Sequence, residues 1–231
     1  MTLRANSTLI VDGNSRILVD LGCFSSLDEI DTALRAATEF GLEEITDCYF
    51  THLHFDHYKP LFPSNTGCRV RFPRREHEFI AKLMRFKDDP DRYRQFLLDT
   101  HELIAPVFLR EFLRLAQDVR YQFADTEAIL QDEGEWLSPH VQTVGLAGHC
   151  PGQLGLRVET AQGVCLIAGD AVISLDDFLA KDTRHHLIVF NREQLLLSRQ
   201  RVAEADYVVP GHGDWFESKR RAIFESSGAN P

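Results

Sequence analysis

The sequence predicts a single α/β (α+β) domain that carries a helical insertion. The chain has 231 residues, which suits one domain with a buried core better than two small ones. Short apolar runs of strand type occupy both ends of the chain, and helix-like composition fills the middle. We therefore expect one domain over residues 1–225, with inserted helices at about 74–122 and a flexible tail at 226–231.

The first part of the chain predicts a hairpin, a helix and two strands. Two β-type runs flank the turn dipeptide Gly13-Asn14, as in a hairpin. Apolar residues at helical spacing follow, and Gly41 is a suitable helix stop. The strands are expected at 8–11, 16–21, 45–50 and 68–72, and the helix at 27–40.

The middle block is interrupted at Asp88-Asp89-Pro90 and at Pro106, where proline breaks helical hydrogen bonding. After the block the β pattern returns, and Asn191 with Gln194 forms a capping-box pattern for a later helix. Strands are expected at 141–146, 154–159, 164–168 and 207–209, and helices at 192–205 and 217–225.

Composition restricts the classes of partner. Asp and Glu number 35 against 25 Lys and Arg, so the chain lacks a globally basic nucleic-acid footprint. No apolar run approaches the roughly 18 residues of a membrane span, and Met1–Ser7 is too polar for a secretory signal. We expect a cytoplasmic protein with no membrane partner.

The five cysteines are scattered and never form Cys-x-x-Cys, which disfavours a disulfide framework or a cysteine zinc knuckle. Cys48 and Cys165 lie in apolar runs, where a free thiol behaves as a small hydrophobe. Cys150 directly follows His149, so it either touches a metal or holds a turn, and we favour the turn.

A metal site is predicted by the stretch Thr51-His52-Leu53-His54-Phe55-Asp56-His57, which follows the apolar run 45–50. Imidazole and carboxylate groups are ligands for zinc, manganese or iron. Four ligands this close exceed what one tetrahedral site takes from a single loop. The stretch therefore predicts two ions.

Three further candidates each follow an apolar strand and are each preceded by glycine. They are His149 in Ala-Gly-His-Cys-Pro-Gly, Asp170 in Ile-Ala-Gly-Asp and His212 in Val-Pro-Gly-His-Gly. Glycine lets the chain turn sharply and approach the site closely. Because loops at the ends of strands converge at one edge of a layered domain, four segments can bring seven ligands together.

The combined pattern, His-x-His-x-Asp-His followed by His, Asp and His, resembles that of the metallo-β-lactamase superfamily. The resemblance implies an αββα sandwich and a hydrolase that uses a hydroxide bound by two metals on an ester-like or phosphodiester bond. It assigns His52, His54 and His149 to one ion, Asp56, His57 and His212 to the other, and Asp170 as the bridge. Asp56 is also the candidate catalytic residue that passes a proton to the leaving group. Zinc is the favoured ion, with manganese and iron as alternatives.

Individual branches of the superfamily resemble the chain in different segments. The segments 61–63 and 198–213 are similar to the metallo-β-lactamase domain-containing protein 1 group, which is associated with nuclease-type hydrolysis but lacks the helical block. Lactonase or thioesterase activity is the alternative, although acyl-homoserine lactonases carry a tyrosine shortly after the bridging Asp, where this chain has 171–173. Glyoxalase II enzymes carry a further C-terminal domain. The residues that follow His212 in this sequence are too few for one, which disfavours that branch. From other classes, a non-catalytic metal-binding sensor or scaffold and an iron redox protein stay open.

The helical block leaves the substrate open between a small molecule and nucleic acid. Residues 69–94 hold nine Lys or Arg against five Asp or Glu, which indicates a basic rim or, as we favour, solvated helix faces. Phe108 and Phe112 are predicted to pack between helices or in a homodimer formed through the insertion, rather than to line a substrate pocket. His185 and His186 either border the pocket or lie in a solvated loop. The remaining histidines, His77, His101 and His140, are expected to be ordinary surface or core residues.

Overall fold

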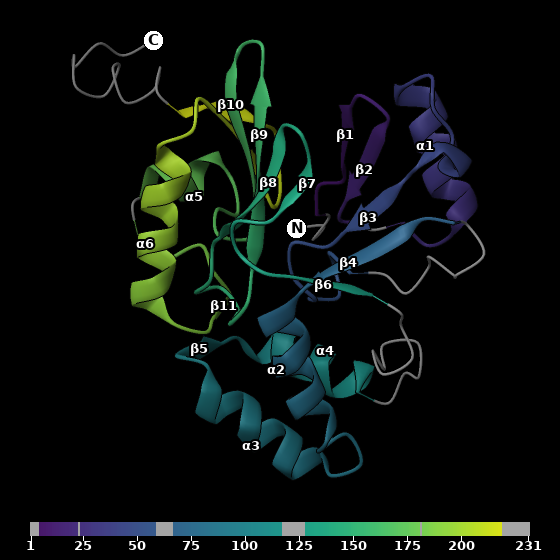
Figure 1. The fold of residues 1–231 in the computed structure, drawn as a ribbon. Helices are drawn as coiled ribbons and strands as arrows, with labels where there is room; N and C mark the ends of the chain where they lie inside the picture. The colour runs from purple at the N-terminus through teal and green to yellow at the C-terminus, as the bar shows by residue number, and fades with distance from the viewer. Residues whose placement is uncertain (1–4, 23, 59–66, 117–127, 181, 219–231) are drawn as a thin grey trace, which may run out of the picture.

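The computed structural model describes residues 5–22, 24–58, 67–116, 128–180 and 182–218, which form two facing β-sheets with helices outside them (Figure 1). The first sheet has the order β1-β2-β3-β4-β6. Its antiparallel β1–β2 hairpin confirms the prediction, and the strands after it pair in parallel. The strands are β1 (Thr8–Asp12), β2 (Ser15–Val19), β3 (Asp47–Tyr49), β4 (Arg69–Pro73) and β6 (Ile129–Gln131).

The second sheet has the order β13-β12-β10-β9-β8-β7 and contains the strands predicted near the C-terminal end. Its pairs are antiparallel except for β10 and β12, which run parallel. The strands are β7 (Trp136–Ser138), β8 (Val141–Gly145), β9 (Leu154–Thr160), β10 (Gly163–Gly169), β12 (Tyr207–Pro210) and β13 (Phe216–Glu217). A separate two-stranded sheet joins β5 (Leu103–Ile104) to β11 (Ile188–Val189).

Helices cover the outer faces of both sheets (Figure 1). The first sheet is flanked by α1 (Leu27–Ala37), which Ser26 caps by accepting from the backbone N–H of Glu29. The second is flanked by α5 (Leu175–Ala180) and α6 (Arg192–Ala203). Asn191 caps α6 by accepting from the backbone N–H of Gln194 at 2.8 Å, but its own N–H donates to the carbonyl of Gly148, so only half of the predicted capping box forms. The insertion contains α2 (Arg74–Met84), α3 (Pro90–Thr100) and α4 (Pro106–Leu115).

The core follows the alternation of strand side chains. Ile17 and Val19 of β2 pack toward Leu156 and Ile167 of the second sheet, whereas Leu18 between them packs under the helices. A third cluster fills the space between the second sheet and α5 and α6. These layers give the predicted αββα sandwich.

Two predicted helices need correction. The helix expected to end at Phe40 ends at Ala37, because Thr38 is extended and its N–H closes the last turn on Leu34. The helix expected over 217–225 is wrong at its start, because Glu217 lies in β13 and pairs with Tyr207 of β12. Residues 219–225, the predicted tail at 226–231, the end of the predicted insertion at 117–122 and the segment 61–63 lie outside the described residues. No helix in the described ranges has the length and apolarity that crossing a membrane requires.

Candidate metal centre

The structure brings all seven predicted ligands together at the edge where strands of both sheets end. The loop 51–57 follows β3, His149 follows β8, Asp170 follows β10 and His212 follows β12. Asp170 lies centrally, with its oxygens 3.1 Å from Nε2 of His57 and 3.4 Å from Nε2 of both His149 and His212. The expected convergence of four segments is therefore present.

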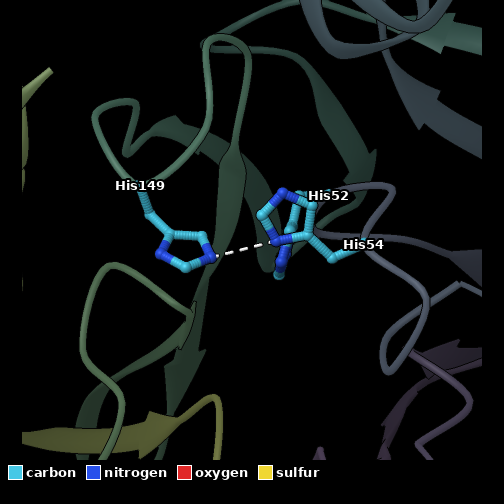
Figure 2. A group of neighbouring side chains, drawn as sticks. All are labelled: His52, His54 and His149. Atoms are coloured by element: carbon cyan, nitrogen blue, oxygen red, sulfur yellow. Dashed lines mark hydrogen bonds between the residues drawn. The ribbon is translucent and has the colours of Figure 1, made fainter. Parts of the chain in front are cut away.

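Two groups of three side chains each offer atoms close enough to hold a metal ion. In the first, Nε2 of His149 lies 3.0 Å from Nδ1 of His54, and His52 stands beside them (Figure 2). The second group consists of Asp56, His57 and His212. A further group joins His52, His57 and Asp170, so it takes one histidine from each of the other two. This overlap is what a carboxylate between two ions requires.

The buried polar atoms at this edge fit a metal centre. Among the described residues, Nε2 of His52 and Oδ1 of Asp56 are buried without a hydrogen-bond partner, while Nε2 of His57 and Oδ1 of Asp170 face each other at 3.1 Å. Leaving buried polar atoms unpaired costs free energy, so two at one spot call for a ligand. Imidazole nitrogens and carboxylate oxygens together match zinc, manganese or iron.

Burial keeps three of the imidazoles neutral. Burial lowers the pKa of His52 and His149 well below the usual value, and it lowers the pKa of His54 to about 3. A neutral imidazole has the free lone pair that coordinates a metal. The first group is therefore in its ligating state at neutral pH.

The second group contains charged partners. Burial lowers the pKa of His57, but the carboxylates of Asp170 and Asp20 outweigh it and raise that pKa well above its usual value. Burial conversely raises the pKa of Asp170, but the His57 and His212 imidazoles outweigh it and lower that pKa. Burial raises the pKa of Asp56. A divalent ion would replace the proton on His57.

Asp20, which the sequence did not reveal as a site residue, orients two of the candidate ligands. Its carboxylate lies 2.8 Å from Nδ1 of His57 and accepts from the hydroxyl of Thr51 at 2.8 Å, and that hydroxyl lies 3.1 Å from Nδ1 of His52. Such outer partners fix ring orientation in metal sites. A carboxylate directly after β2, the parallel neighbour of β3, was the available signal.

Cys150 belongs to none of the metal groups among the described residues. Its buried thiol lies 3.9 Å from Oε1 of Gln153, within the turn after His149. His77, His101 and His140 also lie outside the metal groups: His77 stacks on Phe72, Nδ1 of His101 lies 2.9 Å from the carbonyl oxygen of Leu97, and His140 pairs with Asp12. His185 is exposed, whereas His186 is buried with Nδ1 at 3.4 Å from Nδ1 of His149.

Glu76, at the start of α2, is a second residue that the sequence did not reveal. It is buried, and its carboxylate accepts from the backbone N–H of Gly152 at 3.1 Å and from that of Leu53. Leu53 separates His52 from His54, and Gly152 follows His149. Glu76 therefore fastens the insertion to both loops of the first group.

We expect the pH dependence of stability to change in Glu76→Gln. Burial raises the pKa of Glu76 from 4.5 to about 7. Because the folded pKa lies above the unfolded one, the protonated group stabilises the fold fully below pH 4.5 and this contribution is lost as pH rises through about 7. Wild-type unfolding free energy should fall relative to the variant by up to about 3 kcal/mol across that interval. Urea denaturation on both sides of it measures this, with exposed Glu78→Gln as control; a pH-independent difference contradicts it.

Comparisons with known proteins agree with this geometry. A family model described as the metallo-beta-lactamase superfamily matches residues 2–212. A search of curated proteins finds no match. Among solved structures, the hydrolase AbOPH of the beta lactamase superfamily has a TM-score of 0.61 at 19% identity, covering 90% of this chain and 72% of its own.

Two further similar structures are a dizinc protein and a di-iron protein. AidC, a dizinc quorum-quenching lactonase in complex with a product, has a TM-score of 0.59 at 17% identity and covers 90% of this chain and 72% of its own. TTHA1623 in a di-iron-bound form has a TM-score of 0.58 at 18% identity and covers 96% of this chain and 94% of its own. At these identities the likeness concerns the fold. The family model and the fold together show that the chain belongs to the metallo-beta-lactamase superfamily and is a metallo-hydrolase of that superfamily.

Proposed function

We propose that the chain hydrolyses an acyl bond, of an ester, lactone or thioester, at a dinuclear metal centre. His52, His54 and His149 would hold one ion, Asp56, His57 and His212 the other, and Asp170 would bridge them. Two divalent cations, with zinc favoured, would supply Lewis acidity that lowers the pKa of water and polarises the carbonyl oxygen of the acyl group. The overlapping groups and the unpartnered buried atoms support this assignment.

The observation that favours an acyl substrate is an aromatic wall that α4 places against the candidate centre. The ring of Phe112 lies 5.5 Å from that of His54, and the ring of Phe108 lies 5.4 Å from that of Phe55. Both phenylalanines are buried and contact the metal-binding loop, a place that the sequence did not predict for them. Such a wall suits the apolar part of an acyl substrate.

The basic stretch at 69–94 supports a phosphodiester substrate less well than the aromatic wall supports an acyl substrate. Arg69 and Arg71 both bind the buried carboxylate of Asp47, at 2.7 and 2.6 Å, and Arg74 binds Asp132 at 2.9 Å. These three arginines already donate to carboxylates, so they have fewer free N–H groups for a phosphate. Nuclease-type hydrolysis, which the likeness to the metallo-β-lactamase domain-containing protein 1 group suggests, is therefore our second proposal.

Lactone cleavage is favoured by a separate observation. The similar structures include AidC with N-hexnoyl-L-homoserine and an N-acyl homoserine lactone hydrolase with N-hexanoyl-L-homoserine at its catalytic metal centre. In place of the tyrosine expected after the bridging Asp, this chain has Ala171 and Val172, both fully buried. A lactone would therefore be held by different contacts here.

We assign Asp56 as the group that moves the proton from water to the leaving group. It is buried beside the centre, Oδ1 has no hydrogen-bond partner, and Oδ2 lies 3.7 Å from Nε2 of His212. The other carboxylate, Asp170, has a lowered pKa and stays ionised.

Metal analysis combined with a substrate panel tests the proposal. The panel contains an aryl ester, a lactone, a thioester and bis(p-nitrophenyl) phosphate. We expect two equivalents of metal and turnover of an acyl substrate in preference to the phosphodiester. Preference for the phosphodiester would support the second proposal, and stoichiometric metal without any turnover would indicate a sensor or scaffold.

Phe112→Leu is expected to lower kcat/KM for an aryl ester by about tenfold, because part of an apolar contact worth one to a few kcal/mol is lost. Turnover of bis(p-nitrophenyl) phosphate should change little. Leu98→Ala, an exposed position on α3, serves as the control within the same insertion. An equal loss for both substrates would show that Phe112 supports the centre instead of contacting the acyl group.

A further inference from the structure

A row of three buried side chains stands behind His149, on the side away from the candidate centre. Nδ1 of His149 lies 3.4 Å from Nδ1 of His186, and Nε2 of His186 lies 3.3 Å from Oδ2 of Asp177. The guanidinium of Arg199 donates to the same oxygen at 2.6 Å and also to the backbone carbonyl of Asp177. The row thus runs Arg199–Asp177–His186–His149.

The row is built into the fold. Asp177 belongs to α5, Arg199 to α6, and His186 precedes β11. Asp177 and His186 are 0% and 2% exposed, and Arg199 is 7% exposed. Asp177 also accepts from the backbone N–H of Ile173 at 2.9 Å, which fixes the carboxylate. Burying a charged pair and a histidine costs desolvation free energy, so their retention here calls for a role.

The positions of the protons follow from the distances. Nε2 of His149 faces His54 and Asp170, so a neutral His149 that offers this nitrogen to a metal carries its proton on Nδ1. That proton points at Nδ1 of His186, which must then accept. The proton of His186 then sits on Nε2, where the carboxylate of Asp177 accepts it at 3.3 Å; Nη1 of Arg199 lies 3.5 Å from the same nitrogen but donates to Asp177 at 2.6 Å. Each partner fixes the tautomer of the next.

We propose that His186 is a positioning residue that orients His149 as a metal ligand, with Asp177 and Arg199 fixing its own tautomer. This inference deepens the proposed function, because it rests on the dinuclear centre. Partners of this kind set the ring orientation and basicity of a ligating histidine, and their loss weakens metal affinity by about 10- to 100-fold. Here the partner is a second histidine placed between the ligand and the carboxylate.

Packing alone is the competing explanation, because His186 also fills buried space. The two roles predict opposite rescue patterns. Asparagine places a side-chain oxygen where Nδ1 of a histidine lies and can still accept from His149. Leucine fills similar volume but accepts nothing. A packing role would be restored by His186→Leu, and a positioning role by His186→Asn.

The experiment measures zinc affinity of the full chain, stripped of metal and titrated in competition with a chromophoric chelator. His186→Ala and His186→Leu should weaken one of two binding steps by about 10- to 100-fold, and His186→Asn should recover most of that loss. His185→Ala, the exposed neighbour, should bind as the wild type does. Thermal unfolding of the metal-free variants shows that each is folded.

Two results would overturn the inference. Affinity in His186→Ala equal to that of the wild type, or rescue by leucine as complete as by asparagine, would remove the positioning role while leaving the proposed function intact. A wild-type chain that binds no zinc, manganese or iron would overturn the proposed function, and this inference with it. Because the readout is metal affinity, the result does not depend on which substrate is cleaved.

Discussion

Asp170→Asn is expected to reduce hydrolysis by at least about a thousandfold and to weaken binding of both ions. The carboxylate lies within 3.1 to 3.4 Å of His57, His149 and His212, so it contacts both candidate groups. Asparagine keeps its shape but removes one of the two negative charges that offset two divalent cations. Losing Lewis-acid stabilisation of about 4 kcal/mol corresponds to about a thousandfold in rate. Metal content and kcat of the purified variant measure both effects.

Asp56→Asn provides the matched comparison. It also removes one buried carboxylate from the same edge. Asp56 groups only with His57 and His212, whereas the group of Asp170 takes one histidine from each of the other two groups. We expect Asp56→Asn to retain more metal than Asp170→Asn and to lose kcat even when metal occupancy is restored. Unchanged kcat at full occupancy would remove the proton-transfer role of Asp56. Equal metal loss in both variants would contradict the bridging position of Asp170.

The sequence revealed the candidate ligands because the evidence for them is local. His52, His54, Asp56 and His57 share one loop, and glycine marks each of the three later positions. The structure explains the glycine before His212: a Cβ at Gly211 would come within 1.8 Å of Oδ1 of Asp170. Strand-end position and a flanking glycine are both readable without coordinates, and so are the short apolar runs that predicted the strands.

The outer partners could not be read in the same way. Asp20 bonds to His57, which is 37 residues away, and Glu76 bonds to Gly152, which is 76 residues away. Asp177 bonds to Arg199, which is 22 residues away. No periodicity links such positions, because tertiary packing alone brings them together. The helical pattern of α4 likewise showed that Phe108 and Phe112 share an apolar face, but not that this face meets the metal-binding loop.

Gly148→Ala is expected to destabilise the fold by about 4 kcal/mol, from overpacking and backbone strain together. Gly148 has a φ of +128°, and a Cβ there would lie 2.1 Å from the backbone nitrogen of Leu195 and 2.4 Å from its Cα. The carbonyl of Gly148 also accepts from the backbone N–H groups of Phe190 and Asn191, each at 2.9 Å. Helix α6 therefore lies directly against the residue before His149, and neither backbone can give way cheaply.

Gly134→Ala separates the two contributions. Gly134 also has a positive φ, +86°, but a Cβ there meets no atom within 4 Å. Its substitution should therefore cost only the backbone strain, about 1 to 2 kcal/mol. Urea denaturation of both variants measures the difference, and zinc titration should show weaker binding in Gly148→Ala alone, because α6 and the His149 loop must move apart. Equal destabilisation would mean that the two backbones are not in contact, and His149 would then lack the rigid support from α6 that this packing provides.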